Sequence, residues 1–124
     1  MLWLPKIPYI LELFKETIDE NPTLLNKDGL KATLDKVEWG IPFQPEPTIW
    51  DRVTIFNKDI VEGHFFYDGN KRIGFIISVI FLNKNGYFFN TSNEDVYDMT
   101  IKVAQGMKSF EEIKKWFMDH SKPI

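Results

Sequence analysis

The sequence predicts an all-α protein, a single compact domain of about six helices around one buried central helix. Apolar residues recur at helical spacing in most segments of the chain. One segment, from residue 70 to about residue 84, is apolar on nearly all sides, as a helix at the centre of a bundle must be. Eleven Phe and a hydrophobic fraction of 44% supply the core, and 124 residues suit one domain spanning residues 1–124.

The first part of the chain predicts two helices followed by an irregular loop. Residues 7–21 place their apolar side chains on one helical face, and Asn21-Pro22 is expected to end that helix. Asp28 is expected to cap a second, short helix. Three prolines between residues 39 and 47 then predict a loop, which we expect to form a mobile wall of a groove.

Two further helices are expected on either side of a polar motif. Residues 48–62 carry one apolar stripe, and Gly63 is well placed to stop the helix. The apolar helix from residue 70 is the central one, and it is expected to close near Gly86.

The last part of the chain predicts two amphipathic helices, each opened by a capping box. The capping pairs are Thr91 with Glu94 and Ser109 with Glu112. Residues 86–90 are either a short strand or a packed connection. His120, near the end of the last helix, suits the helix dipole there and is interpreted as structural.

The motif "HFFYDGNKR", residues 64–72, gathers the polar residues that can do chemistry. They are His64, Asp68, Asn70, Lys71 and Arg72. The preceding helix ends at Gly63, so residues 64–69 form a loop and the central helix starts near Asn70. A helix N-terminus presents unpaired N–H groups and partial positive charge, which favour anions.

Each residue type in this motif suits phosphate chemistry. Gly69 permits close approach of a phosphate, while Lys71 and Arg72 lie at the end of the helix where cations are unfavourable unless an anion binds. His64 can take a proton from a hydroxyl. Asp68 is a natural Mg²⁺ ligand, although it can also serve as an ordinary N-cap. Phe66 is expected to point inward and anchor the loop.

The motif resembles the signature of the Fic/Doc family, His-x-Phe-x-[Asp/Glu]-[Gly/Ala]-Asn-[Gly/Lys]-Arg. Lys71 makes it similar to the Doc (death-on-curing) toxin branch, whereas Fic proteins that transfer AMP carry Gly at that position. The likeness continues through the apolar helix and its Asn-Gly end, and more weakly through residues 27–37. Phe65 stands where many members carry Pro.

The resemblance implies a Fic/Doc-like all-α domain and a protein-modifying transferase that uses ATP and Mg²⁺. His64, Asp68 and Arg72 would be catalytic, with His64 as the base and Asp68 as the metal ligand. Gly69, Asn70, Lys71 and Arg72 would bind the phosphates of the nucleotide. A Doc-like protein would be a toxin of a toxin-antitoxin module that passes the γ-phosphate of ATP to a threonine of translation elongation factor Tu.

Two other functions stay open beside this kinase hypothesis. One is a Fic-type AMP transferase that accommodates Lys71, and the other is a non-catalytic module that binds a partner protein. Some Fic proteins carry an inhibitory helix with the pattern [Ser/Thr]-x-x-x-Glu-[Gly/Asn]; the nearest segment here has Asn21 in place of the Glu. Control by a separate antitoxin is therefore expected.

Composition narrows the remaining possibilities. The net charge of −3 is not typical of a protein that binds nucleic acid. The absence of Cys excludes disulfides, Cys-ligated zinc and thiol nucleophiles. The longest apolar run, residues 73–82, is too short to span a bilayer. We therefore expect a soluble, cytoplasmic protein without a membrane or nucleic-acid partner.

Overall fold

Six helices make up 61% of the chain, which confirms the predicted all-α fold. The computed structural model describes all residues from 1 to 124. The elements are α1 (Ile7–Thr17), α2 (Lys27–Trp39), α3 (Ile49–Gly63), α4 (Asn70–Lys84), β1 (Tyr87–Phe89), α5 (Asn93–Ala104), α6 (Phe110–Asp119) and β2 (Ser121–Pro123). None of these helices combines the length and the apolar character that crossing a membrane would require.

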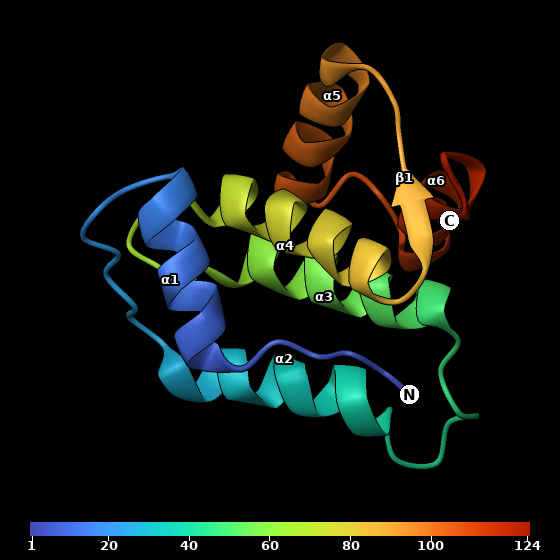
Figure 1. The fold of residues 1–124 in the computed structure, drawn as a ribbon, viewed down its shortest axis with the longest axis horizontal. Coiled ribbons are helices and arrows are strands. Elements are labelled where there is room, and N and C mark those ends of the chain that lie inside the picture. Colours follow the sequence, from blue (N-terminus) through green and yellow to red (C-terminus); the bar gives the residue numbers. More distant parts are fainter.

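Helices α3 and α4 form the centre of the fold and lie side by side in Figure 1. Gly74 allows the close approach, because a Cβ there would lie only 2.7 Å from a methyl group of Val61. Ile73, Ile77 and Phe81 are fully buried along α4. The apolar helix predicted from residue 70 is therefore the central helix of the domain.

Helices α1 and α2 cover one side of this pair. Helix α2 is joined to α3 by Asp59, whose carboxylate accepts a hydrogen bond of 3.0 Å from the Thr33 hydroxyl and pairs with Lys36 at 2.5 Å. Helix α1 contributes Ile10 and Phe14 to the core. These contacts fix the end of α3 from which the polar motif emerges.

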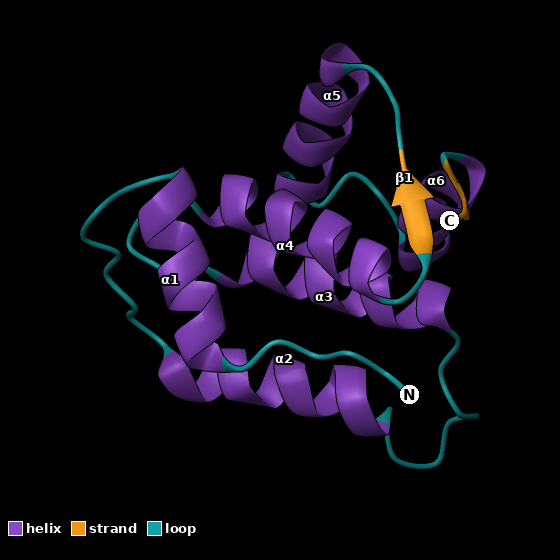
Figure 2. Cartoon of the chain, viewed as in Figure 1, coloured by secondary structure: helices purple, strands orange, loops and turns teal.

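The other side is closed by a two-stranded antiparallel sheet and by α6. Strands β1 and β2 pair with Phe88 opposite Lys122, and Figure 2 shows β1 beside α6. Residues 86–90 thus contain a short strand, one of the two possibilities left by the sequence. Phe89 is buried against the ring of Trp116 on α6, with their ring centroids 5.0 Å apart.

Two helix boundaries differ from those expected. Helix α1 ends at Thr17, because the N–H groups of Ile18 and Asp19 both donate to the carbonyl oxygen of Phe14 and the chain leaves the helix. Helix α2 is capped by Asn26, whose side chain accepts from the Gly29 N–H at 2.8 Å. Asp28 was the wrong choice of cap and lies in the first turn, where a carboxylate also suits the helix dipole.

The capping box at Ser109 and Glu112 is confirmed, whereas the one at Thr91 is wrong. Ser92 caps α5 by accepting from the Asp95 N–H at 3.1 Å. The Thr91 hydroxyl instead donates to the Asp95 carboxylate at 2.9 Å. Thr91 and Ser92 can both serve as the N-cap of α5. The Asp95 carboxylate binds the Thr91 hydroxyl, and Ser92 is the residue that caps the helix.

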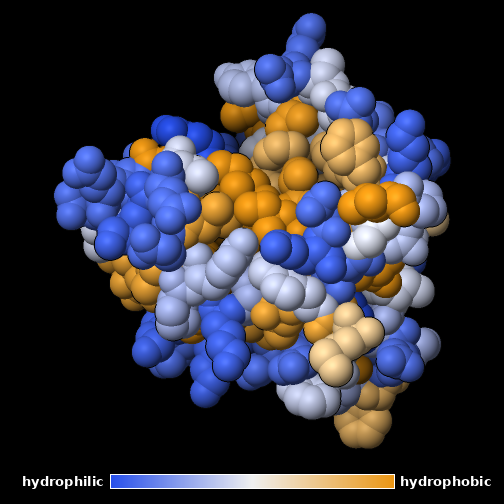
Figure 3. All heavy atoms as spheres, viewed as in Figure 1, coloured by the Kyte–Doolittle hydropathy of each residue, from blue (hydrophilic) through white to orange (hydrophobic).

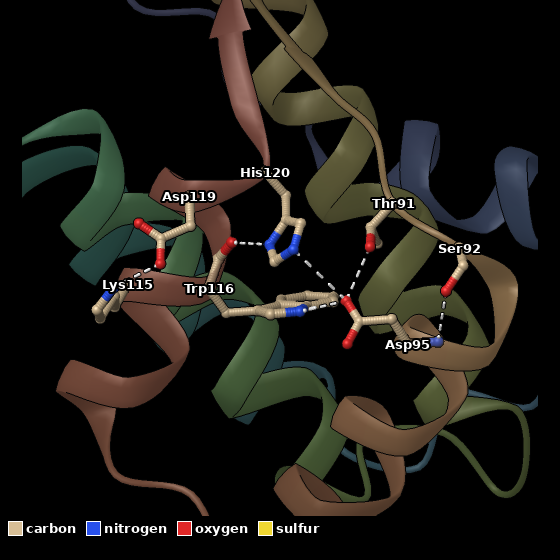
Figure 4. A network of polar contacts seen from close by, with 7 residues as sticks. All are labelled: Thr91, Ser92, Asp95, Lys115, Trp116, Asp119 and His120. Atoms are coloured by element: carbon tan, nitrogen blue, oxygen red, sulfur yellow. Dashed lines mark hydrogen bonds and ion pairs between the residues drawn. The ribbon is translucent and has the colours of Figure 1, made fainter.

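Asp95 joins α5 to α6 through the polar network of Figure 4. Its carboxylate accepts a hydrogen bond of 2.8 Å from the Trp116 indole and lies 3.8 Å from Nε2 of His120. His120 is held in turn by a 2.8 Å contact between its Nδ1 and the Trp116 carbonyl oxygen, which fits a structural role. The indole hydrogen bond is the main cause that lowers the pKa of Asp95, with smaller contributions from Thr91 and His120, against an opposing effect of burial.

Replacing Asp95 by Asn should destabilise the protein at neutral pH but not in acid. The folded-state pKa lies below the ordinary value of 3.8, so the charged network contributes stability above that pH and loses it as the pH falls through the folded-state pKa. We expect Asp95→Asn to lower the free energy of unfolding by about 1 kcal/mol at pH 7, since the pair is partly exposed and screened. Urea denaturation at pH 7, and at decreasing pH down to the lowest at which the wild type stays folded, measures how the difference shrinks.

The control is Asp98→Asn, which removes an exposed carboxylate on the same helix that has no partner. This variant should match the wild type at every pH measured. A difference in stability between Asp95→Asn and the wild type that does not shrink as the pH is lowered would contradict the charged role of Asp95.

Candidate active site

The motif loop is held together by the side chain of Asn70. Its Oδ1 accepts from the Phe66 N–H at 2.9 Å, and its Nδ2 donates to the Phe66 carbonyl oxygen at 2.8 Å. The Asn70 residue is only 9% exposed. One amide therefore satisfies both backbone groups of a buried residue and closes the loop onto the first turn of α4.

The Phe66 ring anchors this loop in the core, as the sequence predicted. It is 1% exposed and lies with its centroid 4.8 Å from that of Phe14 on α1. The loop backbone is also pinned by the α1–α2 connection, since Leu25 N–H donates to the Phe65 carbonyl oxygen at 2.8 Å and Tyr67 N–H donates to Thr23 at 2.9 Å. The loop is thus fixed from both sides.

His64 ends α3 in the left-handed conformation, with φ 51° and ψ 41°. The sequence suggested Gly63 for that turn, but Gly63 is the last helical residue. A glycine is needed at residue 63 for packing, because a Cβ there would lie only 2.7 Å from the Phe65 ring. The left-handed turn leaves His64 exposed, without hydrogen bonds, on the wall of a cleft.

Helix α4 begins without a side-chain cap. Its N-cap is Gly69, which has φ 82° and has no room for a Cβ, since that atom would lie 2.8 Å from the Phe14 ring. Asp68 does not cap the helix; its Oδ1 accepts from the adjacent Gly69 N–H at 2.8 Å. The backbone N–H groups of Lys71 and Arg72 have no hydrogen-bond partner. They remain available to an anion.

All the motif residues named by the sequence except Phe66 and Phe65 lie around one cleft of about 1120 Å³. From the loop and the two central helices it is lined by Val61, His64, Tyr67, Asp68, Gly69, Asn70, Lys71, Arg72, Phe75 and Ile76. From α5 and its C-terminal end it is lined by Asn93, Val96, Tyr97, Thr100, Ile101, Ala104 and Gln105. Figure 3 shows hydrophobic surface in the hollow where α4 and α5 meet. A cleft of this size can accept a small organic ligand.

The cationic side chains of the cleft are free. Lys71 and Arg72 are exposed, and neither forms an ion pair or hydrogen bond with the protein. They stand in the first turn of α4, where the helix dipole disfavours positive charge. An anion bound between them and the free N–H groups would relieve that repulsion, so this end of the cleft suits phosphate groups.

Asp68 is the one carboxylate that lines the cleft, and no cluster of three or more His, Asp or Glu side chains forms a complete metal site anywhere in the chain. Its Oδ2 makes no hydrogen bond, so an oxygen is free for a cation. Mg²⁺ is commonly held by one or two carboxylates together with phosphate oxygens and water. The residues present therefore fit a Mg²⁺ that arrives with a nucleotide.

The α5 wall is the part of the site that sequence reasoning missed. The apolar stripe predicted for this helix includes Val96, which lines the cleft, but not the neighbouring polar residues. The cleft face of α5 could have been found, because Glu94, Asp95, Asp98 and Lys102 all avoid it. The proline loop does not line this cleft: it precedes α3, whose 15 residues separate it from the motif by about 22 Å. It lines a separate, smaller pocket beside the start of α6.

Comparison with known families agrees with this geometry. The model of a family described as Fic/DOC matches residues 16–82, more than half of the chain, from the end of α1 through most of α4. No curated protein matches the chain. Proteins of that family are typically protein-modifying transferases that use ATP with a divalent metal, and many act with antitoxin partners.

Replacing Asn70 by Ala should destabilise the protein strongly. The change leaves the buried N–H and C=O of Phe66 without partners, each at a cost of about 1–3 kcal/mol. We expect the free energy of unfolding to fall by about 2–4 kcal/mol in chemical denaturation. Asn83→Ala is the control, since the Asn83 side chain is exposed on the same helix and makes no hydrogen bond. Equal stability of the two variants would mean that Asn70 does not hold the loop.

Proposed function

The chain belongs to the Fic/DOC family, and on that premise we propose that it transfers the γ-phosphate of ATP to a Thr or Ser hydroxyl of a target protein. The observation that carries this choice is Lys71, an unpaired cation on the cleft wall next to the free N-terminus of α4. The Fic proteins that transfer AMP have Gly at this position. The proposal therefore depends on what a lysine does to the nucleotide.

Lysine changes the phosphate site in two ways. A glycine lets a phosphate approach the backbone closely, whereas a lysine fills that space with a long side chain and adds a mobile charge. The nucleotide would then lie reversed, with its γ-phosphate near the target hydroxyl. Together Mg²⁺, Lys71 and Arg72 supply about four positive charges, which balance the charge of ATP.

His64 is the base of the proposed reaction. It accepts the proton of the target hydroxyl while the hydroxyl oxygen bonds to the γ-phosphorus. The bond from that phosphorus to the β,γ-bridging oxygen breaks, and ADP leaves with the electron pair. Lys71, Arg72 and the free N–H groups of α4 stabilise charge on the transferred phosphoryl group. Mg²⁺ at Asp68 supplies further charge neutralisation when it is bound.

The biological role we propose is that of a Doc-like toxin. Its target would be a translation elongation factor such as elongation factor Tu, and a separate antitoxin would restrain it in the cell. The support is the Doc-like Lys71 within a motif that otherwise follows the family pattern.

Label from γ-labelled ATP should reach a target protein, and label from α-labelled ATP should not. The reason is the reversed nucleotide, in which the γ-phosphorus is nearest the acceptor. Incubating the protein with each labelled ATP, Mg²⁺ and a cell lysate, followed by gel autoradiography, measures the transfer. Lys71→Gly should lose γ-label transfer, while Lys84→Gly, at the far end of α4, should keep it. Transfer of the α-label by the wild type would contradict the kinase proposal and support AMP transfer instead.

His64→Asn should lower the transfer rate at least about 100-fold without loss of stability. A general base typically contributes 10²–10⁴-fold, and Asn cannot accept the proton. Asn tolerates the left-handed conformation of this position, so the turn should survive. Transfer rates and thermal melts are compared with those of His120→Asn, which changes the other histidine outside the cleft. An active His64→Asn protein would exclude His64 as the base.

A further inference from the structure

We propose that the proline loop, residues 39–47, is a docking site for the target protein, with the rings of Trp39 and Phe43 seated in an apolar pocket that has a basic border. This inference rests on the proposed function, because it takes the partner to be the protein that receives the phosphate. It assigns a role to a surface about 22 Å from the motif, at the opposite end of α3.

The first observation is that the proline loop holds its large apolar side chains in water. Phe43 is fully exposed, Trp39 is 77% exposed, and Ile41 between them is about half exposed. Five consecutive residues therefore present three large apolar side chains to the solvent. A concentration of this kind on a protein surface is typical of an interaction site.

The second observation is that Phe43 has an unfavourable backbone conformation. Its φ is 65°, in the left-handed region. The Gln44 N–H donates to the Ile41 carbonyl oxygen at 3.1 Å, which closes a β-turn with Pro42 second and Phe43 third. A positive φ at the third position of such a turn favours Gly, and a bulky residue there is an outlier. Burial of the ring does not offset this strain, and uncompensated strain is concentrated at functional positions.

Arg52 of α3 holds both ends of the loop. Its Nη1 donates to the carbonyl oxygens of Val37 and, at 2.8 Å, of Glu38 near the end of α2. Its Nε donates to the Pro47 carbonyl oxygen at 3.3 Å, just before α3. Figure 1 shows this connection extending outwards from the ends of α2 and α3. The loop thus presents its rings from fixed ends, which reduces the entropic cost of docking.

The charge of the loop decides which kind of partner fits. Residues 38–47 contain two carboxylates, Glu38 and Glu46, and no Lys or Arg. Glu38 is exposed and unpaired, and the Glu46 side chain is 90% exposed. An anionic membrane or the same loop of a second copy would be repelled by these carboxylates. A protein surface with an apolar pocket and basic residues around it is complementary to them.

The target protein is the partner favoured by the position of the loop. The loop precedes the first residue of α3, and the proposed base, His64, follows the last. A standard interface covers about 800 Å² per partner, roughly 30 Å across, so one folded protein can contact both ends of α3. The proposed chemistry acts on a hydroxyl, which most proteins expose. A second contact is what would distinguish one target from another.

The test measures γ-label transfer to the lysate protein that receives it, purified and used at a series of concentrations. Phe43→Gly should raise the KM for this protein at least about fivefold and leave kcat unchanged, since the ring contributes to binding and not to chemistry. The variant should unfold at the same urea concentration as the wild type or at a higher one, because Gly favours a positive φ. Phe88→Ala is the control, because it removes an exposed ring on β1 and should leave the KM unchanged.

A pentapeptide centred on the modified Ser or Thr is the second acceptor. Fully extended, it spans about 18 Å, less than the roughly 22 Å between the loop and the motif. Wild type and Phe43→Gly should therefore modify the pentapeptide equally well. Glu38→Lys should also raise the KM for the whole protein, whereas Asp98→Lys, the same charge reversal on α5, should not.

A photo-crosslinker identifies the occupant of the loop directly. Phe43 is replaced by p-benzoylphenylalanine, and the protein is irradiated in the lysate. The crosslinked product should contain the same protein that carries the γ-label.

Each outcome decides a different claim. An unchanged KM of Phe43→Gly, or a crosslink only to a protein without γ-label, overturns the docking site but leaves the proposed function standing. A crosslink between two copies of this chain assigns the loop to self-association and overturns the docking site as well. Equal loss of transfer to the whole protein and to the pentapeptide contradicts docking, because the pentapeptide cannot reach the loop. Absence of γ-label from every lysate protein overturns both the proposed function and this inference.

Discussion

The two hydrogen bonds between the Asn70 amide and the Phe66 backbone are the constraint on which the site depends. They close the motif loop onto the helix that follows it. His64 lies two residues before Phe66 and Asp68 two residues after it, so fixing Phe66 also positions both residues of the proposed site relative to the N-terminus of α4. Because the bonds are buried, water does not compete for them, and the loop is held in one conformation.

Two left-handed residues bracket this loop, and each is maintained by packing. His64 and Gly69 both have positive φ. A left-handed conformation costs a residue with a side chain about 1–2 kcal/mol, which burial of Phe65 and Phe66 next to His64 can offset. At Gly69 the Phe14 ring occupies the place of a side chain. Packing of the aromatic core therefore determines where the loop turns, and these turns set the positions of His64 and Asp68.

The two walls of the cleft are built by different parts of the chain. The motif wall is local, made from residues between 61 and 76, and lies within the residues that match the family. The α5 wall lies beyond the match and is positioned by α6 through Asp95 and Trp116. The residues proposed for the chemistry thus lie within the part of the chain that matches the family, whereas α5 lies outside it.

The sequence by itself determined the six helices, the central position of α4 and the placement of the polar motif at its N-terminus, because these depend on local periodicity and on neighbouring residues. It predicted the wrong caps, Asp28 and Thr91, because Asn26 and Ser92 lie one or two residues away and their side chains can cap a helix equally well. Only the structure showed that the Asn70 side chain binds the Phe66 backbone and that His64 adopts the left-handed conformation. It also decided that Tyr97, far from the motif in sequence, faces the same cleft. Tyr97 reaches the cleft through contacts between distant segments. The Asn70 bonds span only four residues, but they need the loop conformation that packing on Phe14 and pairing with the α1–α2 connection maintain. Periodicity encodes neither.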